Sequence, residues 1–75
     1  MAEQGEKRYV DWFRVIVDLE RQGYGATTVA LSIAVPKTTL LGWKGGSRPK
    51  FEEGNLLIDL WARVLEKGRD QVPMI

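Results

Sequence analysis

Hydrophobic residues recur at helical spacing in the segment VDWFRVIVDLERQ, residues 10–22. A helix over this range gathers its apolar side chains on one stripe, which consists of Trp12, Val15, Ile16 and Leu19. Its charged side chains face away from that stripe, and they are Asp11, Arg14, Asp18 and Arg21. Gly23 and Gly25 permit the open or left-handed backbone that ends a helix. The pattern therefore predicts a first amphipathic helix.

The segment ATTVALSIAV, residues 26–35, predicts a second, short helix. One of its faces carries Val29, Ala30 and Ile33. Either Thr27 or Gly25 can cap the N-terminus of this helix. The small side chain of Ala30 leaves room for another helix to cross closely.

A proline marks the start of a third helix. Pro36 disfavours helical geometry at the preceding Val35, yet its fixed φ suits the first turn of a helix. We therefore expect a bend at residues 34–35 and a helix over residues 36–45. Its inner side would carry Pro36, Leu40 and Trp43, and the glycines at positions 45 and 46 would end it.

The segment FEEGNLLIDLWARVLEK, residues 51–67, predicts the longest helix. Apolar residues recur along it at helical spacing, at Leu56, Leu57, Leu60, Trp61, Val64 and Leu65. Glu52 and Glu53 lie at its positive end and Lys67 lies near its negative end, which suits the helix dipole. The segment that follows, GRDQVPMI, has no period.

Four helices without an alternating strand pattern predict an all-α fold, a small four- to five-helix bundle. A chain of 75 residues has room for one hydrophobic core, so residues 1–75 are expected to form a single domain. Residues 1–8 and 68–75 are expected to be flexible tails. Each tryptophan lies on an apolar helical face, so we expect core packing for Trp12, Trp43 and Trp61.

The composition argues against several classes of chemistry. The chain has no cysteine and no histidine. It therefore lacks disulfides, thiolate and imidazole metal ligands and the commonest general base, and we expect no enzymatic activity, cofactor, metal or small-molecule substrate. The opening MAEQGEKRYV lacks the apolar core of a signal peptide, and no apolar run is long enough to cross a bilayer. We expect a cytoplasmic protein without membrane contact.

Charge is segregated along the chain, although the formal net charge is only +1. Residues 22–51 contain no acid, and their basic residues are Lys37, Lys44, Arg48 and Lys50. The rest of the chain has an excess of acids. This stretch is either a favourable surface for a polyanion or ordinary solvated charge.

The apolar positions of residues 26–49 follow the spacing of a helix-turn-helix, whose second helix is presented to the major groove of DNA. The buried positions would be Val29, Ile33, Val35, Leu40 and Trp43. With Ala30 at the crossing, they resemble the Cro/repressor-type (lambda-repressor-like, XRE-type) family of bacteriophage and bacterial regulators. TTLLGW resembles the core of that family's recognition helix, and GGSRP resembles the loop before its next helix.

Two residues depart from the family's pattern. The family usually has glycine in the turn, where this chain has Ala34, and a polar N-cap on the recognition helix, where this chain has Pro36. Alanine in the turn requires either a positive φ, at some energetic cost, or a slightly different bend.

The resemblance implies a sequence-specific, double-stranded DNA-binding regulator of transcription, a Cro-like repressor in the cytoplasm of a bacterium or of a phage-infected host. Helix 36–45 would read the major groove, and a homodimer would bind the half-sites of a palindromic operator. The dimer interface would come from the loop after Gly46, from the last helix, or from the apolar tail residues Val72, Met74 and Ile75.

Helical geometry turns one side of helix 36–45 outward, and its candidate base-reading residues are Lys37, Thr38, Leu41 and Gly42. Lys37 can donate to guanine, Thr38 can bond to a base edge, and Leu41 can pack on a thymine methyl group. Gly42 either lets the duplex approach closely or is a simple local weakness of the helix. Candidate phosphate-binding residues are Thr27, Thr39, Lys44, Arg48 and Lys50.

Two other functions use the same residues. One is a helix-turn-helix adaptor that recruits a DNA packaging or replication machine. The other is an antitoxin-like protein-interaction module, in which Leu31 and Leu41 contact another chain. Salt-dependent binding to duplex DNA separates the protein-interaction module from the two DNA-binding functions.

Overall fold

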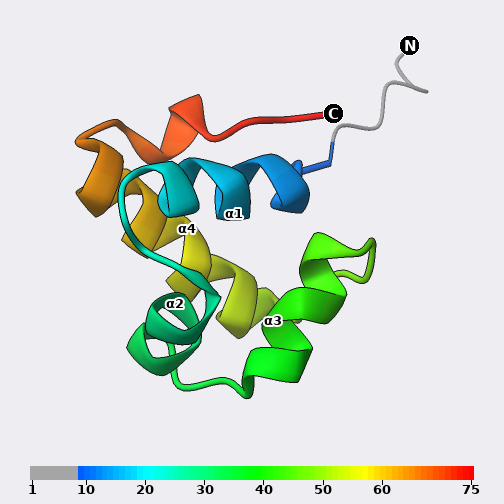
Figure 1. Ribbon diagram of the computed structural model, residues 1–75. Coiled ribbons are helices and arrows are strands. Elements are labelled where there is room, and N and C mark those ends of the chain that lie inside the picture. The colour runs from blue at the N-terminus through cyan, green and yellow to red at the C-terminus, as the bar shows by residue number, and fades with distance from the viewer. Residues whose placement is uncertain (1–8) are drawn as a thin grey trace, which may run out of the picture.

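Four α-helices and a 3-10 turn follow one another in the computed structural model, which describes residues 9–75 (Figure 1). They are α1 (Trp12–Arg21), α2 (Ala26–Ser32), α3 (Lys37–Lys44), α4 (Phe51–Leu65) and η1 (Arg69–Gln71). The described residues contain no strand beyond an isolated bridge, so the predicted all-α class is confirmed. The flexibility expected of residues 1–8 lies outside the described residues.

The hydrophobic core lies where α1, α2, α3 and α4 meet. Helix α1 begins at Asp11, whose side chain accepts a hydrogen bond from the Arg14 backbone N–H at 3.1 Å. The fully buried side chains are Val15, Ile16, Leu19, Val29, Leu40, Leu57 and Trp61, each less than 2% exposed. Trp43 is buried as well, whereas Trp12 is only partly buried at the start of α1. No helix in residues 9–75 is long and apolar enough to cross a membrane.

A left-handed residue joins α2 to α3. Ala34 has a φ of 60°, as one of the two turn geometries considered from the sequence requires. Its N–H donates to the Leu31 carbonyl at 3.3 Å, and the Val35 N–H donates to the Ala30 carbonyl at 3.0 Å. This pair of bonds is the Schellman motif, which satisfies carbonyls that the end of a helix leaves unpaired. The chain then leaves α2 at an angle set by Ala34, and Pro36 caps α3 in an extended conformation.

A glycine in α4 accommodates the ring of Trp12, which comes from the start of α1. Gly54 is buried, and a Cβ atom at this position would lie 3.1 Å from Trp12 Cη2 and 3.6 Å from Pro49 Cγ. Any side chain here would crowd the tryptophan ring. The first turn of α4 therefore lies against the start of α1, and α4 continues beneath α1 toward the tail (Figure 1).

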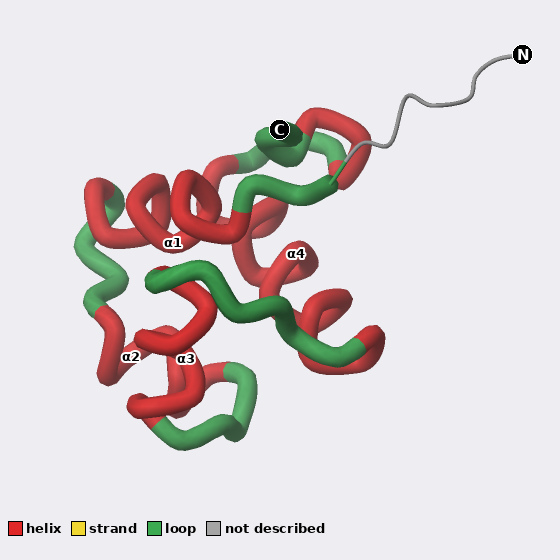
Figure 2. Tube along the Cα trace, turned by 90° about the vertical axis from the view of Figure 1, so that its right-hand side faces the viewer, coloured by secondary structure: helices red, strands yellow, loops and turns green. Residues whose placement is uncertain are grey.

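The tail has more structure than its sequence predicts. Val10 and Met74 form an antiparallel bridge, in which the Asp11 N–H donates to Pro73 O at 2.9 Å and the Ile75 N–H donates to Tyr9 O at 2.7 Å. Residues 73–75, within the expected flexible tail 68–75, thus pair with residues 9–11 just before α1, and Figure 2 shows the two segments side by side.

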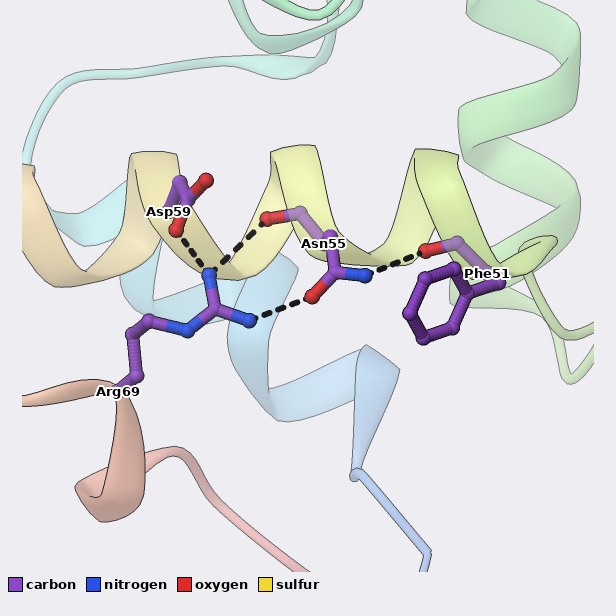
Figure 3. A network of polar contacts seen from close by, with 4 residues as sticks. All are labelled: Phe51, Asn55, Asp59 and Arg69. Atoms are coloured by element: carbon purple, nitrogen blue, oxygen red, sulfur yellow. Dashed lines mark hydrogen bonds and ion pairs between the residues drawn. The ribbon is translucent and has the colours of Figure 1, made fainter.

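One arginine fastens η1 to α4 (Figure 3). The Arg69 guanidinium donates hydrogen bonds to the carboxylate of Asp59 and to the side-chain oxygen of Asn55. The amide of Asn55 in turn donates to the Phe51 carbonyl at 3.1 Å. The contacts of Arg69 lie at the surface and join η1 to α4, and no hydrophobic pattern in the sequence indicates that these two segments meet.

Three expectations about side-chain direction are wrong. Asp18 does not face away from the core, because its carboxylate accepts a hydrogen bond at 3.1 Å from Trp61 Nε1, whose ring is buried. Leu56 is 48% exposed, since the buried side of α4 is centred on Leu57, Leu60 and Trp61. Pro36 is exposed because it caps α3 rather than belonging to its inner side.

The Ala34 geometry predicts a stabilising substitution. Ala34→Gly removes the steric cost of the left-handed conformation, partly offset by the greater freedom of glycine in the unfolded chain, so the free energy of unfolding should rise by about 0.5–1 kcal/mol. Chemical denaturation measures the change. The same type of substitution inside a helix, Ala62→Gly in α4, should instead lower stability by about 1 kcal/mol. A loss of stability in Ala34→Gly would contradict the strain assigned to the turn.

Candidate functional site

Helix α3 presents one face to solvent and buries the other. Leu40 is fully buried and Trp43 is 4% exposed, and together they hold α3 against α1 and α2. On the opposite face, Lys37 and Thr38 are exposed, and Leu41 is 44% exposed. The helix lies at the edge of the bundle, at the lower right in Figure 1. A donor, a hydroxyl and an apolar side chain are thus available on one convex surface.

Gly42 adjoins this face and is not required by the fold. A Cβ atom at Gly42 would meet only Ser47 Oγ, at 3.9 Å, which is an ordinary contact. Its backbone is helical, so any residue could adopt it. The fold therefore has room for an alanine at this position.

Lys44 is already paired, which the sequence does not predict. Its Nζ atom lies 2.9 Å from Glu20 Oε2, and the two side chains are 30% and 34% exposed. Glu20 belongs to the last turn of α1. The fold therefore places a carboxylate from another helix beside residues 22–51, which contain no acid of their own. Lys44 stays a candidate phosphate contact, for which a phosphate would compete with Glu20.

Arg48 lies over an aromatic ring. Its Cζ atom is 3.9 Å from the centroid of Tyr9, which is a cation–π distance. The stacking orients the guanidinium while both side chains stay exposed. No periodic signal links residue 9 to residue 48, and the Tyr9 contact was not predicted.

The other candidate phosphate contacts are dispersed. Lys50 is exposed just before α4, and its backbone N–H donates to Glu53 Oε1 at 3.3 Å. Thr27 is exposed in the first turn of α2, where Gly25 rather than Thr27 is the N-cap. Thr39 is partly buried at the side of α3. The exposed cations closest in sequence to α3 are therefore Lys37, Arg48 and Lys50.

A hollow of about 190 Å³ lies between the end of α3, the start of α1 and the tail. Tyr9, Trp43, Ser47, Arg48 and Ile75 are among its lining residues. Residues 9–75 contain no cluster of acidic side chains able to hold a metal ion.

No family model matches the chain, and neither curated proteins nor solved structures give a significant match.

Proposed function

We propose that the chain is a sequence-specific DNA-binding regulator of transcription, with α2, the Ala34 turn and α3 acting as a helix-turn-helix. The observation that carries the proposal is the division of α3 into a buried face, Leu40 and Trp43, and an exposed face bearing Lys37 and Thr38. The inner face sets the orientation of the helix, and the outer face would enter the major groove.

The outer face has the chemistry for reading base edges. Lys37 would donate to the O6 and N7 atoms of guanine, Thr38 would bond to a neighbouring base, and Leu41 would contact a thymine methyl group. Arg48 and Lys50 would bind phosphates, which position the protein on the duplex without reading its sequence. Because one short helix supplies limited affinity, two subunits would bind the two halves of a palindromic operator.

Exposed leucine favours a second candidate function, the protein-interaction module. Leu31 is 77% exposed on the outer side of α2, and the DNA-binding proposal does not use it. Leu41 would then belong to a protein contact instead of a base contact. The two candidates differ in their dependence on salt, because only the DNA complex releases counterions from phosphates.

Selection from a random pool of duplexes tests the proposal. A palindromic consensus should be enriched, and log affinity for it should fall with log salt with a slope of about −1.8 per subunit for two neutralised phosphates. Lys37→Ala should relax the preference at one base position, whereas Arg48→Ala should weaken binding to all sequences alike. A slope near zero favours the protein-interaction module. Salt-dependent binding without an enriched sequence favours the packaging or replication adaptor.

The Glu20–Lys44 pair should limit affinity. Glu20→Gln removes a carboxylate near the proposed phosphate surface and releases Lys44, so affinity should rise a few-fold for every duplex and the salt slope should steepen by about 0.9. Fluorescence anisotropy at several salt concentrations measures both quantities. Glu66→Gln at the far end of α4 makes the same charge change as a control, and equal effects of the two variants would rule out a local role for the pair.

Gly42→Ala distinguishes two explanations of Gly42: that it lets the duplex approach α3 closely, or that it is only a local weakness of the helix. Alanine fits the space and favours the helix, so the variant should be more stable by about 1 kcal/mol. If the duplex approaches α3 at this point, affinity for the selected operator should fall at least about tenfold, a cost of about 1.4 kcal/mol. Thermal unfolding and anisotropy measure the two effects. A stabilised variant with unchanged affinity would mean that Gly42 is only a weak point in the helix.

A further inference from the structure

The start of α4 carries an aromatic side chain with almost no cover. Phe51 is 84% exposed, more than any other large hydrophobic residue in the described part of the chain. Figure 3 shows its ring projecting from the first turn of α4, away from the helix axis. A single exposed apolar residue is common on protein surfaces, so its meaning depends on what lies beside it.

A hollow of about 200 Å³ adjoins Phe51. Its apolar walls come from Trp12, Pro49 and Ile58, and Gly54 also lines it. A cavity of about 150 Å³ is sufficient to bind a benzene ring. The hollow therefore has the size and lining to receive a phenyl ring.

Phe51 lies at the rim of this hollow and leaves it open in its own chain. A projecting ring beside a hollow that fits a ring is self-complementary under a two-fold axis, since each copy supplies both parts. We propose that two copies of this chain associate at the N-terminal ends of α4, with Phe51 of each copy inserted against Trp12, Gly54 and Ile58 of the other.

The charges around Phe51 fit the same arrangement. Lys50 and Glu52 stand on either side of it, and both are exposed. When two such segments meet antiparallel about a two-fold axis, Lys50 of one copy faces Glu52 of the other, while Glu53 accepts a hydrogen bond from the Lys50 backbone of its own copy. Such rim pairs select the orientation of an interface more than its strength. This complementarity favours a second copy over an unrelated partner.

The contact is centred on two aromatic side chains from each copy, Trp12 and Phe51. Interfaces of this limited extent belong to the small, reversible class, so a dissociation constant in the micromolar range is expected. The proposed interface uses the first turn of α4 and not α3, and Lys50 is the one residue that it shares with the proposed DNA-binding surface. Dimerisation is therefore measured without DNA and can fail independently of the proposed function.

Sedimentation of the full chain from about 10 μM to about 1 mM tests the proposal. The wild-type protein should change from monomer to dimer over this range. Phe51→Ser should weaken association at least about tenfold without lowering the thermal midpoint, because the side chain is exposed in the monomer. Leu31→Ser, at a residue that is 77% exposed on α2, should associate like the wild type. A wild-type protein that stays monomeric, or a Phe51→Ser variant that associates equally well, would overturn the proposal.

The indole N–H signals in an NMR spectrum give a second measure of the same contact. The Trp12 signal should shift with protein concentration in the wild type and stay constant in Phe51→Ser. The Trp61 signal should stay constant in both, because its N–H is bonded to Asp18 inside the monomer. A dimer that forms without a Trp12 shift would place the interface elsewhere and overturn the proposal.

Discussion

The left-handed conformation of Ala34 determines the direction in which α3 leaves α2, and the exposed surface of the protein follows from it. The two Schellman hydrogen bonds end α2, and the chain turns within the residues up to Pro36. If this residue adopted a right-handed conformation, the two Schellman hydrogen bonds would be lost and α3 would leave α2 in a different direction. The energetic cost of a positive φ at alanine is therefore tied to the geometry of the candidate DNA-binding surface.

The rest of the bundle acts as a support for α3. Trp43 and Leu40 are held by α1 and α2, and α1 in turn packs on α4, where the Trp12 ring lies against Gly54. The hydrogen bond from Trp61 to Asp18 joins the same two helices and satisfies the indole donor. These contacts are largely apolar and lie within one chain, so the exposed side chains of α3 project from a surface that forms without a ligand.

Much of this architecture could be predicted from local patterns. Each of the four helices follows the apolar periodicity because each buries one face. Pro36 predicts the bend because it disfavours helical geometry at Val35. The same short segment also indicated a positive φ at Ala34 as one of two turn geometries. The exposed direction of Lys37 and Thr38 follows from helical geometry once Leu40 and Trp43 are placed inside.

Contacts between distant segments could not be predicted in this way. Glu20 and Lys44 belong to different helices, and no local pattern shows that their ends meet. Asp18 resembles a solvent-facing residue until the buried indole of Trp61 requires an acceptor. The tail pairs through backbone groups, which carry no hydrophobic period. Leu56 was misplaced because the apolar stripe of α4 is wider than the face that it buries.

The pairing of Tyr9 with Ile75 closes a loop that spans nearly the whole described chain. The contact is made by backbone groups beside the exposed side chains of Tyr9, Met74 and Ile75, so it opens more readily than the core. Tyr9 also carries the Arg48 guanidinium on its ring. Opening of this bridge would therefore free Tyr9 and release Arg48 from its ring. The pairing of residues 73–75 would thus influence the basic surface near α3, which is remote from these residues in sequence.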